Sequence, residues 1–359
     1  MGIKGLQRLI DTHASHVQIT FPYLKYRTRV VAVDANILIY KFCHNYTTSI
    51  SSFVLCFVYK ILSFIKYGIL PIFIFDGEAP HEKRKAVRRR FHCKNILRER
   101  LLKLRHLPFR NSSIYSQIQR LERQCFIATK QHKSSLMKLL DLLGIPYLVS
   151  KNEAEMLCAL LQKQNMVDFT LSEDTDTYAF GCTHVLRMFR NSEKYLVETN
   201  FTDFLRSLQL TNDEFLNVCV LSGCDYIDHV IPYLNIQHCI EIVKEHHDLE
   251  SCLNVIRTQY PHIKISSEEY NRVKSIYTFK HESVQEVVKQ CQELNHDDFK
   301  TKFHTLKKFD EVGFKHWLSV DLSVNASTIQ CLCNIIHNSF QDYSLIRSNF
   351  NKKIEDVVT

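Results

Sequence analysis

Seven acidic residues stand where a short apolar run ends or where a helix is about to begin: Asp34, Asp76, Glu153, Glu155, Asp174, Asp176 and Asp225. Asp34, Asp76 and Asp174 each follow closely on an apolar run that is too short for a helix and is typical of a buried strand. The carboxyl ends of parallel strands lie at one edge of a sheet, where α/β proteins bind their ligands. We therefore expect these carboxylates to meet in one place.

Each acid also has a simpler structural interpretation. Asp34 has the position of a helix N-cap, Asn152 and Glu155 have the spacing of a capping box, and Asp174 with Asp176 fits a turn. Together, however, these acids would crowd one sheet edge, where mutual repulsion raises carboxyl pKa values. Hard divalent cations such as Mg²⁺ or Mn²⁺ resolve that conflict, and a set of this size can hold two ions about 4 Å apart.

A strongly basic segment, residues 83–110, follows shortly after Asp76. Glu99 is the single acidic residue of this segment, and its basic residues are Lys83, Arg84, Lys85, Arg88, Arg89, Arg90, Lys94, Arg98, Arg100, Lys103, Arg105 and Arg110. An acid that can hold a metal ion, beside cations that can hold phosphate, is the combination that metal-assisted phosphodiester chemistry requires. The alternative interpretation is a plain Asp-Gly turn followed by a solvated helix.

Alternating strands and helices must position these residues. The strands expected are 29–33, 72–76, 145–149 and 168–171, with a hairpin of 184–189 and 195–197 around Arg190 to Ser192. The helices expected are a short one after Gly5, then 37–43, 53–67, 83–105, 109–130, 133–143, 152–161, 213–222, 237–247 and 270–278. This order predicts a mostly parallel α/β sheet up to residue 200 and a helical region beyond it. After Asn295 the periodicity is weak, and the last ten residues are expected to be loose.

The composition limits the class of protein. The chain has 359 residues, 45% of them hydrophobic, and a formal net charge of +8, so one large domain or two smaller ones are expected. The 13 cysteines are odd in number and scattered without a C-x-x-C, which indicates free thiols in a reducing compartment. No signal peptide is recognised, and the most apolar run, 53–65, is too short to cross a bilayer and is interrupted by Lys60. We expect a soluble intracellular protein with no membrane partner.

Eight sequence blocks carry a resemblance: M-G-I-K-G-L, V-A-V-D-A-N-I-L-I-Y, F-I-F-D-G-E-A-P, T-K-Q-H, L-L-G-I-P-Y-L, N-E-A-E, S-E-D-T-D and L-S-G-C-D-Y. In order and spacing they resemble the flap endonuclease/XPG family of structure-specific 5′-nucleases over residues 1 to about 250. The resemblance implies a PIN-like α/β fold, with a mostly parallel central sheet flanked by helices, a helical gateway or arch, and a C-terminal helix–two-turn–helix type region. It divides the chain into an N-terminal nuclease region 1–105 with a basic gateway 83–130, an internal nuclease region 131–250 with a helix–two-turn–helix-like segment 219–247, and a divergent helical region 251–359.

The resemblance also implies roles for single residues. The family's metal-site acids fall on the seven acids above, with Asp228 as a more distant eighth, and imply two Mg²⁺ ions for which Mn²⁺ can substitute. The catalytic residues implied are Lys83, Arg90 and Asp174; the two cations are seven apart on one helix face, where both can meet one scissile phosphate. Tyr40 matches the aromatic residue on which a base of the substrate stacks. The residues expected to contact DNA are Gly2, Tyr40, Lys60, Lys83, Arg84, Arg88, Arg89, Arg90 and Lys130.

Two departures from the family pattern stand out. The stretch Ile231-Pro232-Tyr233-Leu234-Asn235-Ile236 has no glycine where the family carries G-[IV]-G for gripping duplex phosphate. No Q-x-x-[ILM]-x-x-[FY]-[FY] segment for docking a sliding clamp is found near the C-terminus. These departures indicate a divergent member, such as one encoded by a large DNA virus, acting as a monomer.

The function expected is that of a Mg²⁺-dependent 5′-nuclease that cleaves DNA with 5′ flaps or other single-strand/duplex junctions during replication and repair, in the nucleus (the host nucleus for a viral protein). One alternative is an RNA-directed endonuclease on the same fold. Another is a non-catalytic DNA-junction-binding protein. The presence of all seven acids and both catalytic cations argues against the second alternative, because an active site that has lost its catalytic function should have lost some of these residues.

Overall fold

A seven-stranded mixed sheet forms the centre of the computed structural model, which describes residues 2–13, 17–46, 49–107, 109, 111–188, 194–227, 231 and 234–358. The strands are β1 (Gln18–Pro22), β2 (Val30–Asp34), β3 (Leu70–Phe75), β4 (Tyr147–Val149), β5 (Phe169–Leu171), β6 (His184–Met188) and β7 (Tyr195–Asn200). Their order is β1-β7-β6-β5-β2-β3-β4. The pairs from β6 to β4 are parallel, whereas β7 pairs antiparallel with both β6 and β1. The expected mostly parallel sheet is confirmed.

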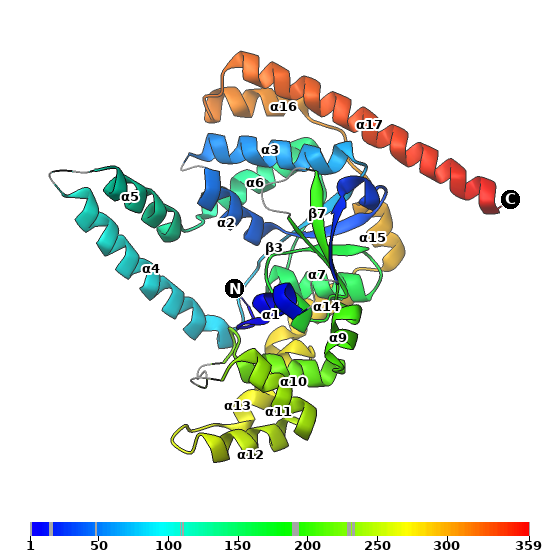
Figure 1. The fold of residues 1–359 in the computed structure, drawn as a ribbon. Coiled ribbons are helices and arrows are strands. Elements are labelled where there is room, and N and C mark those ends of the chain that lie inside the picture. Colours follow the sequence, from blue (N-terminus) through cyan, green and yellow to red (C-terminus); the bar gives the residue numbers. More distant parts are fainter. Residues whose placement is uncertain are drawn as a thin grey trace.

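The central strands β2 and β3 are buried along their whole length, which explains their unbroken apolar sequences. Helices α2 (Ala35–Tyr46), α3 (Ile50–Lys66) and α6 (Lys130–Leu143) lie on one side of the sheet, and α7 (Ala154–Lys163) lies on the other (Figure 1). In β2 and β3, Val33 pairs with Phe73 and Asp34 with Ile74, so the two strands end almost level. The chain therefore delivers Asp34 and Asp76 to the same edge of the sheet.

Two long helices, α4 (Arg84–Arg105) and α5 (Ser112–Cys125), form an arch that projects from the body of the molecule (Figure 1). The arch holds itself together through a small apolar cluster of its own, formed by Leu97, Leu101, Leu104, Ile114, Ile118 and Leu121. Most other side chains of α4 are exposed, and eight of the exposed ones are charged. This matches the expectation that the basic segment stands away from the core.

Several helix boundaries follow from local capping. Helix α6 begins at Lys130, three residues before the expected start, because Thr129 and His132 form a capping box; it ends as expected at Gly144, whose φ is 68°. Helix α7 begins at Ala154 with Glu153 as its N-cap residue. The capping box expected of Asn152 and Glu155 does not form, because the Asn152 side chain donates instead to the Ser283 carbonyl oxygen (3.1 Å).

The remaining helices are α1 (Leu6–His13), α8 (Asp176–Ala179), α9 (Phe201–Leu208), α10 (Asn212–Ser222), α11 (Ile236–His246), α12 (Leu249–Gln259), α13 (Ser267–Tyr277), α14 (Gln285–Glu293), α15 (His296–Phe303), α16 (Glu311–His316) and α17 (Ala326–Val358). Short 3-10 turns span Tyr23–Tyr26, His81–Lys83 and Glu282–Val284, and a π turn spans Trp317–Asp321. No helix of the described residues is both long enough and apolar enough to span a bilayer.

The C-terminal part of the chain meets one expectation and departs from another. The region after Asn295 is helical, as expected for 251–359, in spite of its weak periodicity, because Phe299, Phe303 and Phe314 are buried in the common core. The last ten residues were expected to be loose, but α17 continues to Val358. The expected hairpin of β6 and β7 is confirmed, and its turn at 190–192 lies outside the described residues.

Candidate active site

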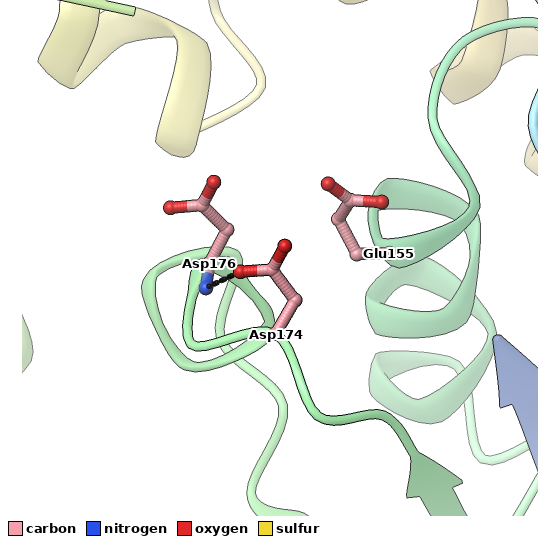
Figure 2. A group of neighbouring side chains, drawn as sticks. All are labelled: Glu155, Asp174 and Asp176. Atoms are coloured by element: carbon pink, nitrogen blue, oxygen red, sulfur yellow. Dashed lines mark hydrogen bonds between the residues drawn. The ribbon is translucent and has the colours of Figure 1, made fainter. Parts of the chain in front are cut away.

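The seven acids predicted from the sequence form one acid cluster (Asp34, Asp76, Glu153, Glu155, Asp174, Asp176 and Asp225). Glu155, Asp174 and Asp176 each present a carboxylate oxygen within 4.8 Å of the others (Figure 2). Glu155 comes from the first turn of α7, Asp174 comes from the segment between β5 and α8, and Asp176 is the first residue of α8. All three are buried, so separate parts of the chain direct charge into one enclosed place.

The two acids at the ends of β2 and β3 adjoin this place. Asp34 accepts hydrogen bonds from the Ile37 amide (3.1 Å) and from the Ser172 hydroxyl (2.9 Å). Asp76 accepts one from the Ala154 amide (2.8 Å), next to Glu153 and Glu155, and another from the side-chain amide of Asn36. Asp34 therefore caps α2 and also belongs to the acid cluster, so both interpretations of this residue hold.

Lys83 and Arg90 join the acid cluster from the lower end of the arch. The Lys83 ammonium contacts Glu153 and lies 3.4 Å from Glu155 and 3.7 Å from Asp225. Arg90 contacts Asp225 and is partly exposed. Lys83, in contrast, is only 6% exposed. Lys83 ends the 3-10 turn that precedes α4, whereas Arg90 lies within α4, so the expectation that both lie on one helix face is wrong. Both cations are nevertheless at the acids, one inside the cluster and one at its rim.

The electrostatics of the acid cluster are unfavourable to ionisation. Burial, followed by the charge of Asp76, raises the pKa of Asp34 to about 7. Burial also raises the pKa of Glu153, and burial with neighbouring carboxylates raises the pKa values of Glu155 and Asp176 well above their usual range. Burial opposes the charge of Lys83, but Glu155 and Glu153 outweigh it and raise the Lys83 pKa. One lysine and one arginine do not balance seven acids.

This arrangement fits divalent metal ions. Every acid of the cluster offers oxygen ligands, which Mg²⁺ and Mn²⁺ prefer. The Oδ2 atom of Asp176 is buried with no hydrogen-bond partner among the described residues, while Oδ1 accepts from the Tyr277 hydroxyl (2.8 Å). A buried, unpaired carboxylate oxygen is costly unless a cation meets it. The prediction that these carboxylates lie close together is confirmed. That they bind metal ions stays a prediction.

The N-terminal glycine reaches the acid cluster. Gly2 has a φ of +81°, and a Cβ atom on it would lie 2.2 Å from Oδ1 of Asp174 and 2.6 Å from Oγ1 of Thr175. The next residue is fixed by a hydrogen bond from the Ile3 amide to the Thr175 hydroxyl (2.8 Å). Glycine is thus required at position 2 both by the backbone conformation and by the lack of space.

The other residues expected to contact DNA lie mostly on the surface. Arg84, Arg88 and Arg89 are exposed on α4, and Lys130 is exposed at the start of α6. Tyr40 on α2 is 37% exposed. Its ring is nearly perpendicular to that of Phe126 (81°, 6.4 Å between centroids), and the Lys94 ammonium lies 5.1 Å from its ring centroid. Their accessibility is compatible with binding, and the contacts themselves stay predictions.

The expectation for Lys60 is wrong. Lys60 is only 4% exposed and its ammonium contacts the Tyr23 hydroxyl, 4.9 Å from the ring centroid of Phe64. A buried ammonium held by aromatic groups cannot reach a phosphate of DNA. This lysine stabilises the packing of α3 against the turn after β1.

Some residues of the site were not found in the sequence. Tyr226 donates to Glu153, Tyr277 to Asp176, and the Lys133 ammonium to the main-chain oxygen of Asp76 (2.5 Å). Tyr226 directly follows Asp225, which is a local signal, but nothing near Tyr277 in the sequence points to an acid 101 residues away. Asp228 lies outside the described residues. So do Pro232 and Tyr233 of the glycine-free segment, whose last two residues are the N-cap Asn235 and the first residue of α11.

The chain is similar to known proteins over most of its length. The model of the XPG N-terminal domain matches residues 1–95, and that of the XPG I-region matches residues 144–225. Flap endonuclease 1 of Danio rerio is 30% identical over 279 residues, which cover 73% of this chain and 71% of that protein. Flap endonuclease 1 of Aedes aegypti is 31% identical over 272 residues, covering 72% and 70%.

Solved structures show the same fold. The catalytic core of Rad2 in complex with a DNA substrate superposes with a TM-score of 0.67 at 19% identity, covering 93% of this chain and 100% of that one. Flap endonuclease-1 of Methanococcus jannaschii superposes with a TM-score of 0.62 at 16% identity, covering 90% and 96%. With both domain models matched in order and relatives aligned over most of their length, the chain belongs to the flap endonuclease/XPG family.

Proposed function

We propose that this protein is a metal-dependent, structure-specific 5′-nuclease that cleaves DNA at junctions between single strands and duplex. The observation that carries the proposal is the buried trio of Glu155, Asp174 and Asp176 with Lys83 and Arg90 beside it at the foot of the arch. Acids that need a cation, next to cations that can hold a phosphate, suit hydrolysis of a phosphodiester. The flap endonuclease 1 relatives support the same activity.

The acid cluster would hold two Mg²⁺ ions, or Mn²⁺ in their place. Such ions activate the attacking water and stabilise the 3′ oxygen that leaves, so that the product carries a 5′-phosphate. Arg90, at the rim, is placed to bind an oxygen of the scissile phosphate. Lys83 adds positive charge from inside the site, where a buried ammonium acts strongly on charge that develops in the transition state.

The elements around the acid cluster suggest how the substrate is selected. The arch of α4 and α5 would pass or enclose the unpaired 5′ strand, and Tyr40 would stack on a base near the junction. Such contacts read shape and charge, not base sequence. Within this proposal, residues 1–105 and 131–250 build the nuclease, residues 251–359 complete the helical region, and the protein works as a monomer on nuclear DNA.

The test is a cleavage panel of labelled 5′-flap, nicked and bubble DNA, with and without Mg²⁺. The double variant Asp76→Asn with Asp174→Asn should lose flap cleavage while still binding the junction, and Glu198→Gln, a carboxylate outside the acid cluster, should cleave as the parent does. A single-stranded RNA of matched length separates the RNA-directed alternative. Retention of full flap cleavage by the double variant would refute the proposed mechanism.

A further inference from the structure

The loop of residues 150–153 leads from strand β4 into α7. On its inner side this loop lies against the residue that follows Asp76. The Gly77 amide donates to the Asn152 carbonyl oxygen (2.7 Å), and a Cβ atom on Gly77 would lie 2.0 Å from a main-chain oxygen of the loop. Because the two segments touch without room for a side chain, the position of the loop determines where Glu153 stands relative to Asp76.

The outer side of this loop is covered by a single glutamine. Strand β4 is the terminal strand on its side of the described sheet. The carboxamide of Gln290, on α14, accepts from the Lys151 amide (2.8 Å) and donates to the Val149 carbonyl oxygen (2.8 Å). A residue of a neighbouring parallel strand makes the same pair of hydrogen bonds, to two residues that are two apart. The side chain of Gln290 therefore takes the place of a further strand at this edge.

A second contact comes from the turn before α14. The Asn152 side chain is 7% exposed and donates to the carbonyl oxygen of Ser283, which lies in the 3-10 turn Glu282–Val284. This turn continues into α14, and α14 packs against α7 (Figure 1). We call the turn and α14, residues 282–293, the brace. The brace lies beyond both matched domain models, the second of which ends at residue 225.

The main chain of the loop is thus held from both sides. The Glu153 side chain contacts Lys83 and the Tyr226 hydroxyl, but these contacts hold its carboxylate and not the main chain that carries it. The main chain is held by Gly77 on one side and by Gln290 on the other. Metal ligands depend on such supporting hydrogen bonds, because a ligand that is free to move binds the ion more weakly.

We propose that Gln290 is a positioning residue of the metal site: by pairing with the edge of β4 it holds the loop 150–153 so that Glu153 stands beside Asp76. The proposal rests on the proposed function, which gives these acids their role as metal ligands. It adds a part of the active site that comes from a helix outside both matched domain models. A brace that only stabilises the fold would change stability alone, whereas a positioning brace must also change the affinity for metal.

The experiment measures binding of Mn²⁺ alone, without DNA, from the electron paramagnetic resonance signal of the free ion. Gln290→Met keeps the length of the side chain and removes both hydrogen bonds. It should raise the apparent dissociation constant about fivefold, the factor that corresponds to one hydrogen bond of average net strength. Binding that survives in Asp174→Asn with Asp176→Asn is subtracted as background. The matched control is Gln330→Met on α17, whose carboxamide donates to Asn334 (3.2 Å); it should bind Mn²⁺ as the parent does.

Hydrogen exchange of the peptide 147–156 shows whether the loop is released. Exchange should be faster in Gln290→Met than in the parent and unchanged in Gln330→Met. Parent-like exchange in Gln290→Met would overturn the proposal, because Gln290 would then not hold the loop. A parent-like affinity for Mn²⁺ would overturn it too, even with faster exchange, because the brace would then be merely structural. Gln290→Ala serves if Gln290→Met does not fold.

Flap cleavage separates this proposal from the proposed function. Gln290→Met should need about five times more Mg²⁺ for half-maximal cleavage, with the KM for DNA unchanged. A parent protein that binds Mn²⁺ at the acid cluster but cleaves no junction would refute the proposed function and leave the role of Gln290 standing. An active Gln290→Met variant with the Mg²⁺ requirement of the parent would refute the role of Gln290 and leave the proposed function standing.

Discussion

Glu198 on β7 and the acid cluster are two places where carboxylates are largely removed from solvent, but only Glu198 has enough partners within the protein. Its carboxylate accepts hydrogen bonds from the Lys25 ammonium (2.6 Å) and the Tyr26 hydroxyl (2.9 Å), and the ring of His184 lies 3.8 Å away. Burial opposes ionisation of Glu198, but the contacts with His184, Lys25 and Tyr26 outweigh it and lower its pKa to about 2. The negative charge of Glu198 is therefore stabilised by partners within the protein.

The acid cluster shows the opposite balance. The same fold holds seven acids together with Lys83 and Arg90, and the pKa values of Asp34, Glu155 and Asp176 are raised because burial and neighbouring carboxylates outweigh the hydrogen bonds that they accept. The comparison teaches that burial alone does not mark a functional acid. A shortage of internal partners does, because the missing charge must come from a bound ion.

The first expected difference between the two regions concerns metal binding. Adding Mg²⁺ or Mn²⁺ should raise the melting temperature of the parent protein. The free energy of unfolding should increase by about 2.7 kcal/mol when the ion is at 100 times its dissociation constant. Asp174→Asn with Asp176→Asn should abolish this increase, because it removes two of the three converging carboxylates. Differential scanning fluorimetry measures it.

The matched variant is Glu198→Gln, which should keep the full metal-induced increase. Equal loss of the increase in both variants would mean that the ions bind to the fold in general and not at the acid cluster. A metal response that survives in the double aspartate variant would contradict the assignment of those ligands.

The next difference concerns the two lysines. Lys83→Met should destabilise the metal-free protein by about 3–5 kcal/mol, because it leaves buried carboxylates without their ammonium partner. Lys25→Met should cost less than about 1 kcal/mol, because the Lys25 side chain is 36% exposed and water screens its ion pair. Urea unfolding in EDTA measures both. Similar costs for the two variants would show that the acid cluster tolerates its charge without Lys83.

The third difference is in the sign of the pH dependence. The pKa of Asp34 is raised from 3.8 to about 7, so between these values the folded protein holds a proton that the unfolded chain has released. The free energy of unfolding must therefore fall as the pH rises through this window. Glu198 acts oppositely: its pKa is lowered from 4.5 to about 2, and its stabilisation is lost as the pH falls from 4.5 toward 2.

Asp34→Asn should accordingly flatten the loss of stability in the upper half of its window, and Glu198→Gln should leave that part of the curve unchanged. Melting temperatures in EDTA at a series of pH values measure the two slopes. The prediction fails if the metal-free parent becomes more stable as the pH approaches 7.

The sequence was sufficient to predict the parts of the molecule that depend on local patterns. The strands β2, β3 and β5 follow from short apolar runs, and the place of Asp34, Asp76 and Asp174 follows from where those runs end. The stop of α6 at Gly144 follows from the conformational freedom of glycine. These predictions needed no knowledge of what packs against what.

The parts that could not be predicted depend on contacts between distant segments. Strand β1 has no long apolar run and exists because it pairs with β7 at the edge of the sheet. The burial of Lys60 depends on Tyr23, which lies in the turn after β1 and whose hydroxyl contacts the Lys60 ammonium. Tyr277 reaches Asp176 only because α13 folds back onto the acid cluster. Side-chain partners of this kind leave no signal within a single sequence window.

The smallest expected difference separates two tyrosines that make the same type of hydrogen bond. The Tyr277 hydroxyl donates to Asp176 (2.8 Å) and the Tyr26 hydroxyl donates to Glu198 (2.9 Å). Tyr277→Phe and Tyr26→Phe should each cost about 1.5–3 kcal/mol, as expected for hydrogen bonds to a charged group, when the pH is high enough to ionise Asp176, whose pKa is raised. Mg²⁺ should restore part of the stability of Tyr277→Phe, because an ion at the acid cluster compensates the charge of Asp176 that the hydroxyl no longer meets. Mg²⁺ should stabilise Tyr26→Phe as much as it stabilises the parent, so the difference between these two proteins should not change. An equal reduction of the difference from the parent in both variants would remove the distinction between the two regions.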